Sequence, residues 1–562
     1  MIAGIRRWLR SVAPDRATLG KDALAGLSGA IGSVPDGMAA AVLAGVNPVH
    51  GLYASFAGRL SGGLTTSTRL MMITTTSAAA LATGSALSSV DPADRTNALF
   101  LVTILAGAMM VVAGLFKLGR YTRFVSHSVM IGFLTGVSVN IIFGQIPDLL
   151  GAEVEGNYSV AKALDVLFEP SSIDLASALV GVGALVLVVV LDRTPISSFS
   201  PIIALLVPTL ISLGVEGIAR VEDVGTIPKG FPLPGLPDLS LLSVDLVVGA
   251  LAIAAIVLVQ GAGVSESAPN PDGSMSNPDR DFIAQGVGNL SSGFFKGQPV
   301  GGSVGQTALN LAAGAKTRWA SIFSGISILL ILVVFSGLVG AVAIPTLAAV
   351  LIYAAVKSLR IGEITTIFRT GPSSQIAIVT TFIATLFLPV AAAVGIGVSL
   401  SLLLQVNQEA IDLRVVELVP RPEGSYLERP APAQLPSHHV TLLLVYGSLI
   451  YAGARTLTAK LPDPVGSEAP AVVLRLRGRT RLGSTAMVVL ATYAKRLASV
   501  GGRLYLSGVD HEVLETIGRA RRMDLTGPVS IFEATPVIGE STEAAYQAAE
   551  TWLVGPVGSE NE

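Results

Sequence analysis

The sequence predicts an α-helical polytopic membrane protein, arranged as an inverted repeat and followed by a soluble α/β domain. The composition is the first observation, because 51% of the 562 residues are hydrophobic and only 14% are charged, whereas soluble domains carry roughly 25% charge. The second is that apolar runs suited to a hydrocarbon layer of about 30 Å recur between residues 23 and 410. The third is the alternation of strand and helix patterns from residue 438 onward.

The first 22 residues are expected to form a cytosolic arm, and fourteen hydrophobic segments follow. They lie at roughly 23–43, 47–64, 73–89, 97–116, 124–147, 174–192, 199–217, 243–265, 281–295, 304–314, 319–339, 341–357, 373–390 and 392–408. Segments nine and ten are shorter than the roughly 20 residues of a full span, and segment three begins with a polar, Thr-rich stretch. Short members at positions three and ten indicate two inverted halves of seven spans.

The charges of the connecting loops predict the orientation. The exits of the even-numbered segments carry most of the Lys and Arg residues, whereas the long loop after segment five is acidic. Because Lys and Arg collect in cytoplasmic loops, we expect a multi-pass protein of the plasma membrane with both termini in the cytoplasm.

The C-terminal part has the pattern of a soluble domain. The transmembrane domain is expected to occupy 23–410, a Pro-rich linker 411–437 and the α/β domain 438–562. The expected strands are His439–Ile450, Ala471–Arg477, Gly502–Ser507 and Val529–Phe532, and the expected helices are Gly453–Lys460, Ser484–Val500, His511–Ala520 and Thr542–Leu553.

An interrupted helix gives the strongest functional signal. Between Asp281 and Arg318 an apolar stretch breaks at Gly-Gln-Pro-Val-Gly-Gly and restarts as a small-residue helix. Such breaks are tolerated only where they are buried in protein or line a wet cavity, and they mark transport sites. If two half-helices begin at mid-membrane, their free N–H groups attract an anion.

The residues expected to form this anion site begin the two half-helices. They are Thr74, Thr75, Thr76 and Ser77 in one, and Ser303, Val304, Gly305, Gln306 and Thr307 in the other. The alternative for the hydroxyl groups is that they satisfy backbone groups and pack helices.

Asp36 is expected to couple transport to an ion. It follows Pro35 within the first span, and an ionisable group there is costly unless it faces the bundle interior or water. The alternative is that it pairs with a neighbouring backbone group or Lys at a kink. Glu266 is a second candidate for coupling or gating, although it could instead lie at the cytosolic interface.

The chain contains no cysteine, which excludes disulfides, thiolate metal sites and cysteine nucleophiles. The sequence also shows no nucleotide-binding P-loop, metal-ligand cluster or nucleophile with a partnered base. We therefore expect a secondary transporter driven by ion gradients. It is expected to have no enzymatic activity, cofactor, metal or nucleic-acid partner.

Three stretches carry a family resemblance: Val34–Ser55 (VPDGMAAAVLAGVNPVHGLYAS), Val129–Gly151 and Phe282–Arg318. Together they resemble the sulfate permease (SulP) family of anion transporters. The C-terminal domain resembles a STAS domain (sulphate transporter and anti-sigma factor antagonist). The resemblance implies a core bundle and a gate bundle, an elevator or rocking mechanism, and a homodimer. It also implies one anion site per protomer, between half-helices three and ten.

The sequence departs from the family pattern at this site. Gln306 stands where many members have Arg, Thr74 and Thr75 stand where they have Gly-Pro, and Gln260 replaces a common Glu in a coupling position. At position 36 some family members have an acidic residue, and Asp36 matches this acidic form. The resemblance implies that such members couple transport to a proton or another cation. A neutral amide cannot pair a divalent anion as a guanidinium does. The resemblance therefore predicts sulfate/proton symport, with bicarbonate (possibly sodium-coupled), a dicarboxylate, or an anion channel or exchanger as alternatives.

The resemblance also bears on regulation. Gly483 stands where STAS domains of anti-sigma antagonists have the Asp that precedes a phosphorylated Ser. This change disfavours phosphorylation at Ser484 or Thr485, and helix capping is the expected role of these residues.

Overall fold

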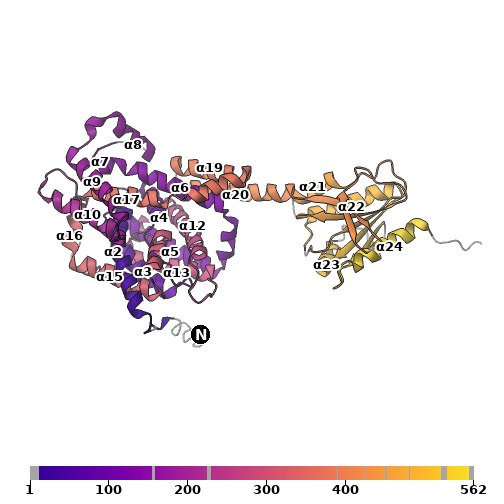
Figure 1. Ribbon diagram of the computed structural model, residues 1–562, viewed down its shortest axis with the longest axis horizontal. Coiled ribbons are helices and arrows are strands. Elements are labelled where there is room, and N and C mark those ends of the chain that lie inside the picture. The colour runs from indigo at the N-terminus through magenta and orange to yellow at the C-terminus, as the bar shows by residue number, and fades with distance from the viewer. Residues whose placement is uncertain are drawn as a thin grey trace, which may run out of the picture. The chain divides into compact units, whose positions relative to one another are not determined.

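The computed structural model describes residues 12–14, 16–154, 158–224, 230–388, 390–422, 424–449, 452–479, 481–520 and 528–555. The chain divides into two compact units, Met1–Ser401 and Leu402–Glu562. The first is helical and the second is an α/β unit (Figure 1). The predicted fold class, a helical membrane region followed by an α/β domain, is therefore confirmed.

All but three of the described helices before the α/β sheet overlap the expected apolar segments. In chain order the described helices are α2 (Leu19–Leu43), α3 (Val49–Thr65), α4 (Ser77–Leu87), α5 (Arg95–Leu115), α6 (His127–Gly144), α7 (Ile146–Leu150), α8 (Ser159–Phe168), α9 (Leu175–Asp192), α10 (Ser200–Ile211), α11 (Val221–Val224), α12 (Val244–Ser267), α13 (Pro278–Phe294), α14 (Val304–Ala312), α15 (Trp319–Val334), α16 (Ser336–Gly340), α17 (Ile344–Ser358), α18 (Ile361–Thr370), α19 (Pro372–Phe387) and α20 (Val390–Ile411). Among the described residues, five helical stretches are long and apolar enough to cross a membrane, and five shorter apolar helices accompany them. The number of fourteen spans stays a prediction.

Three short helices, α8, α11 and α18, were not expected. α8 and α18 contain polar residues, so their segments were not recognised as apolar from the sequence. Each helix nevertheless has one apolar face. Phe168 of α8 and Ile361 of α18 are largely exposed, as befits amphipathic helices at a membrane surface.

The helices form two bundles. α2–α5 pack with α12–α15, whereas α6, α9, α10, α17 and α19 pack with one another. Small residues allow the closest approaches, since a Cβ atom on Gly51 of α3 would lie 1.8 Å from the carbonyl oxygen of Gly37 of α2. Close backbone contact through small residues is the main means by which helices associate in membranes.

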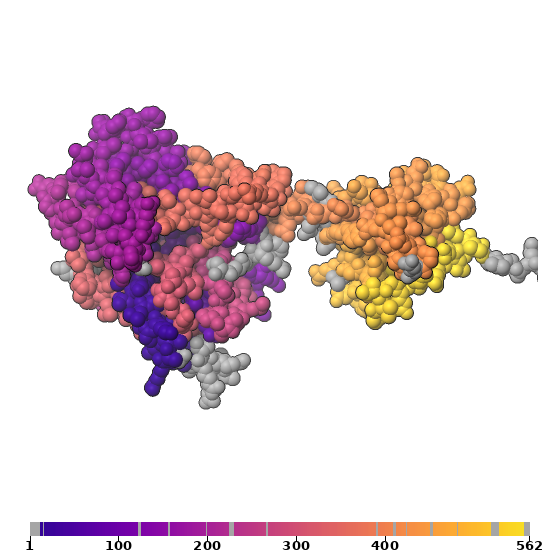
Figure 2. Space-filling model, in the orientation of Figure 1, coloured from indigo at the N-terminus to yellow at the C-terminus, as the bar shows by residue number. Residues whose placement is uncertain are grey.

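The surface of the helical unit is apolar where helices lack protein neighbours. Leu175 and Leu179 of α9 are 72% and 68% exposed. The magenta segment of Figure 2, which contains α9 and α10, lies on the face shown. A continuous apolar surface of this kind suits contact with lipid.

The second unit contains a six-stranded sheet of order β4-β3-β5-β6-β7-β8. Its strands are β3 (Arg414–Pro420), β4 (Tyr426–Pro430), β5 (Val440–Tyr446), β6 (Ala471–Arg475), β7 (Arg503–Val509) and β8 (Val529–Glu533). The pairs from β5 to β8 are parallel, and β3 pairs antiparallel with both β4 and β5. Helices cover both faces of the sheet: α21 (Ala452–Lys460), α22 (Ser484–Ser499) and α23 (His511–Ala520) on one, and α24 (Glu540–Val554) on the other.

The four expected strands and four expected helices of this unit are present, with shifts of a few residues at their ends. The segment 411–437 differs from the expected linker, because it supplies β3 and β4. Pro420 and Pro430 are the last residues of these strands, where proline is tolerated. Val415 and Leu418 enter the cores on the two faces of the sheet. Capping of α22 by Ser484 is wrong, since Gly483 is the N-cap and Ser484 begins the helix.

The Gly51–Gly37 contact yields a prediction. Gly51→Ala should force α2 and α3 apart and lower the free energy of unfolding by about 3 kcal/mol or more, since added bulk in a tight contact strains the backbone. Thermal unfolding of the purified protein in detergent measures the loss. The matched control is Gly183→Ala in α9, where a Cβ atom would meet nothing within 4 Å. An unchanged melting temperature for Gly51→Ala would contradict the close approach of the two helices.

Candidate functional site

Two strands of two residues each join the predicted half-helices. β1 (Ile73–Thr74) pairs antiparallel with β2 (Gly301–Gly302), and α4 and α14 begin within three residues of these strands. The pairing satisfies backbone groups at a point where lipid would offer no partner. A Cβ atom on Gly301 would lie 2.8 Å from the Val257 side chain of α12, so the crossing requires glycine.

The two half-helices expose their first amide groups toward the crossing. The hydroxyl oxygens of Thr76 and Ser303 are N-caps, which accept hydrogen bonds from the amides of Ala79 and Gln306, each at 3.3 Å. The amides ahead of these, at Ser77, Ala78, Val304 and Gly305, have no partner within their own helices. A Cβ atom on Gly305 would meet nothing within 4 Å, so open space borders the first turn of α14.

Three further hydroxyl groups of the expected site also bond to the protein itself. Thr74 donates to the Ser55 hydroxyl of α3 at 3.3 Å, and the Thr75 hydroxyl lies 3.5 Å from the same group. The Thr307 hydroxyl accepts from the Met72 amide at 3.0 Å. These side chains therefore hold the crossing together. Ser77 and the first amides of the two half-helices stay the predicted contacts for an anion.

The structure brings Asp36 and Gln306 together. The Gln306 amide nitrogen donates to Oδ2 of Asp36, and its Oε1 accepts from the Ser33 hydroxyl at 2.6 Å. Asp36 is only partly buried, whereas Gln306 is 7% exposed. Gln306 therefore lies at the start of α14 with its side chain turned toward the middle of α2.

Sequence reasoning missed Arg59, a fully buried residue of α3. Its Nη2 donates to Oε1 of Gln306 at 3.0 Å and also to the Ser33 hydroxyl. Its Nη1 donates to the Gly29 carbonyl at 3.3 Å and to the Ser324 hydroxyl of α15. The available signal was an ionisable residue inside an apolar segment, which is the signal that identified Asp36.

Gln260 of α12 lines a small cavity of about 20 Å³. The other lining residues are apolar and come from α6, the segment before it, α12 and α20: Val125, Val129, Met130, Phe133, Leu134, Ile256, Val259, Val394 and Val398. Oε1 of Gln260 has no hydrogen-bond partner among the described residues. The Glu266 side chain, the other expected coupling group of α12, lies outside the described residues.

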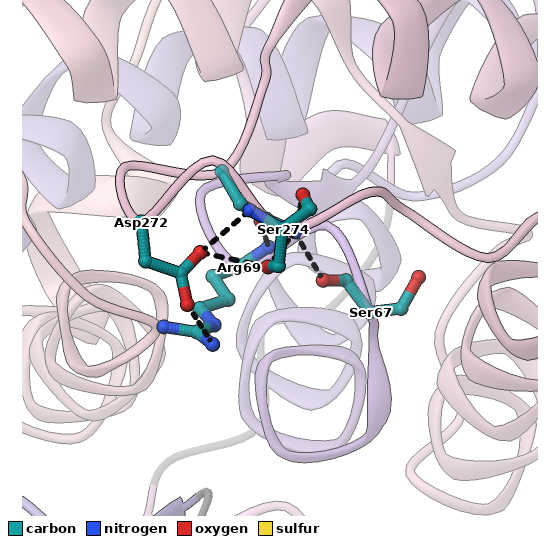
Figure 3. A network of polar contacts seen from close by, with 5 residues as sticks. Ser67, Arg69, Asp272 and Ser274 are labelled. Atoms are coloured by element: carbon teal, nitrogen blue, oxygen red, sulfur yellow. Dashed lines mark hydrogen bonds and ion pairs between the residues drawn. The ribbon is translucent and has the colours of Figure 1, made fainter.

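Polar contacts fix the segment that leads into β1. The Asp281 carboxylate accepts hydrogen bonds from the amides of Ser67 (2.6 Å) and Thr68 (3.1 Å) and from the hydroxyl of Thr66 (2.8 Å). Nearby, Arg69 forms an ion pair with Asp272 at 2.6 Å, and Asp272 also accepts from Ser274. Figure 3 shows how this network joins the α3–β1 loop to the α12–α13 loop.

A helical membrane unit with two half-helices that start at a shared strand crossing defines a secondary-transporter class of fold. Comparison with known proteins agrees with this. Residues 19–384 match the sulfate permease family, and residues 433–535 match the STAS domain. The chain belongs to the sulfate permease family, as the resemblance predicted, and it is an anion transporter with a STAS domain.

Relatives and solved structures cover most of the chain. A probable sulfate transporter of Mycobacterium tuberculosis is 28% identical over 94% of this chain and 95% of its own length. The bicarbonate transporter BicA of Synechocystis is 22% identical over 75% of this chain and 76% of its own. The structure of SLC26A9 has a TM-score of 0.80 at 20% identity and covers 94% of this chain and 90% of its own. The structural likeness supports the fold.

The open space at Gly305 yields a prediction. Gly305→Ala should leave stability unchanged or raise it by about 0.5–1 kcal/mol, because alanine favours the helix. Uptake should nonetheless fall by about tenfold or more, because a methyl group would occupy space beside the free amides.

Uptake into liposomes and thermal unfolding test both parts. Gly183→Ala is again the matched control, since it adds a methyl group to open space in the middle of α9, a helix that does not contribute to the candidate site. Normal uptake by Gly305→Ala would show that the first turn of α14 does not contact the anion.

Proposed function

We propose that this chain is a proton-driven symporter of an inorganic anion, most simply sulfate, in the plasma membrane. The observation that carries the proposal is the pair of half-helices, α4 and α14, whose unpartnered amides converge on the β1–β2 crossing. Helix N-termini bind anions through these amides and through the helix dipole. Relatives named as probable sulfate transporters support the choice of sulfate.

Asp36 is the proposed coupling acid. It lies in the membrane unit, is partly accessible and is bonded to the side chain of Gln306 at the start of α14. A carboxyl group so placed can exchange a proton with water and also respond to an anion at the helix ends. The family resemblance adds an elevator or rocking motion between the two bundles and a homodimer to this proposal. The Lys and Arg residues at the exits of the even-numbered segments add the cytoplasmic location of both termini.

Bicarbonate is the second candidate. The observation that favours it is the likeness to BicA, a bicarbonate transporter whose transmembrane domain has a TM-score of 0.57 to this chain, with 70% of this chain and 98% of its own covered at 19% identity. A site of amides and one buried guanidinium suits an anion of either charge.

Reconstitution tests the proposal. Purified protein in liposomes is given labelled sulfate, bicarbonate or fumarate under an inward proton gradient, an inward sodium gradient or neither. Sulfate uptake that requires the proton gradient would support the proposal. Sodium-driven bicarbonate uptake, or uptake of fumarate alone, would retain the class of transporter and overturn sulfate/proton symport.

The role of Asp36 yields a separate prediction. Asp36→Asn should still bind the substrate while losing accumulation driven by the proton gradient, because the amide has no exchangeable carboxyl proton. Binding is followed by titration calorimetry in detergent and accumulation by liposome uptake. Accumulation against a gradient by Asp36→Asn would rule out the coupling role.

A further inference from the structure

We propose that Arg59 is the counter-charge of Asp36 across the Gln306 side chain. In this arrangement the anion site is neutral while Asp36 is ionised, and it gains one positive charge when Asp36 binds a proton. The inference rests on the proposed anion site and adds a specificity-determining residue to it.

The geometry of Gln306 carries the first step. One amide group serves both charged residues, since its nitrogen donates to Asp36 and its oxygen accepts from Arg59 at 3.0 Å. The amide is thereby oriented by a carboxylate on one side and a cation on the other. A single uncharged side chain separates the two charges, so the charge of each is felt by the other.

Burial carries the second step. Arg59 is fully buried and Asp36 is partly exposed. The guanidinium remains charged and its environment is fixed by Gly29, Ser33 and Ser324, whereas the carboxyl group can exchange protons with water. Asp36 is thus the member of the pair whose charge changes. A proton on Asp36 leaves the positive charge of Arg59 uncompensated beside the first turn of α14.

Other charged groups near the pair lie at helix ends. The charged or titratable residues on elements packed against α2, α3 and α14 are Lys21, Asp22, His50, Tyr53, Asp245, Asp279, Arg280, Asp281, Tyr353 and Lys357, together with Glu266, whose side chain lies outside the described residues. Asp22 accepts from the amides of Lys316 and Thr317, Asp281 holds the α3–β1 loop, and Lys357 pairs with Asp192. These contacts leave Arg59 as the cation that Gln306 links to Asp36.

A thermodynamic consequence follows. An anion at the half-helix ends interacts more favourably with a site of charge +1 than with a neutral one. Proton binding at Asp36 and anion binding therefore favour each other, and reciprocity requires that each ligand raise the affinity of the other by the same factor. Symport needs this linkage, which comes from the proton on Asp36. Arg59 keeps the site from becoming negative when that proton leaves.

The test compares four variants with the wild type. Arg59→Lys keeps the charge, Arg59→Met removes it, Asp36→Asn leaves the site permanently positive, and Asp36→Asn/Arg59→Met removes both charges. Arg318→Met is the matched control for loss of a buried arginine. Arg318 is 4% exposed and donates to the carbonyls of Gly63, Leu64 and Thr66 at the end of α3.

Protons taken up on adding sulfate are measured in a weakly buffered detergent solution, and sulfate affinity is measured against pH. Wild type, Arg59→Lys and Arg318→Met should take up protons and bind more tightly as pH falls. Asp36→Asn should bind with little pH dependence. At the same pH, Arg59→Met should bind on the order of thirtyfold more weakly, the scale expected when a buried charge is removed from a binding site. Its gain in affinity as pH falls should begin at a higher pH than in the wild type, because Asp36 keeps its proton to higher pH without the neighbouring cation.

Folding of the variants is a second readout. Arg59→Met leaves a carboxylate without its partner and should unfold at a lower temperature than the double variant, because removing one member of a buried pair is worse than removing both. If Arg59→Met does not fold, the double variant replaces it in the binding assay, where it should bind weakly and without pH dependence. Tight binding by the double variant would overturn the inference.

An infrared measurement tests the pairing of Arg59 with Asp36 without any added anion. The carboxylic-acid band of Asp36, assigned by its loss in Asp36→Asn, should persist to higher pH in Arg59→Met than in Arg59→Lys. Equal behaviour of these two variants, or a pH profile of proton uptake by Arg59→Met equal to that of the wild type, would overturn the inference while leaving acid-driven uptake intact. Failure of every variant and the wild type to bind sulfate would instead remove sulfate from the proposed function, and the infrared comparison would still test Arg59.

Discussion

The rest of the structure depends on the requirement that no backbone N–H or C=O group be left bare in hydrocarbon. The β1–β2 crossing meets this requirement with two residues from each half of the helical unit. It also permits two helices to begin inside the protein, where their first amides remain available. Several contacts hold this crossing in place. They are the packing of the β2 glycines against α12, the hydrogen bonds of the Thr74 and Thr307 hydroxyls, and the hydrogen bonds of the Asp281 carboxylate to the α3–β1 loop.

The charge at the site is set by residues on neighbouring helices rather than by the half-helices. Gln306 is neutral, yet it contacts a carboxylate on α2 and a guanidinium on α3. The expectation that the site lacks a cation, which followed from Gln306 alone, is therefore changed by Arg59. A buried charge is stable only with partners, and the partners of Arg59 come from three other helices of the same bundle, α2, α14 and α15.

Much of the fold could be predicted from hydropathy and from the interruptions of apolar segments. Both patterns reflect whether a segment is surrounded by lipid or by protein and water. The apolar segments overlapped the helices, and the small residues before α14 identified the break. The prediction failed in two places. The prolines of segment 411–437 led to a linker being predicted where β3 and β4 lie. The polar residues of α8 and α18 kept these short helices out of the list of apolar segments. Arg59 was missed because it lies among small residues near the end of a segment. Its neighbours in space, Ser33 and Gln306, are remote in the chain, and sequence spacing does not reveal such contacts.

The crossing is held by main-chain pairing, glycine and hydroxyl contacts, and the side chains of Asp36, Arg59 and Gln306 make none of these contacts. Substitutions at positions such as 36, 59 and 306 can therefore alter charge without dismantling the frame. Over evolutionary time this would allow selectivity to drift by single steps among descendants that keep the same architecture. The likeness of this chain both to a probable sulfate transporter and to a bicarbonate transporter is what such a history would leave behind.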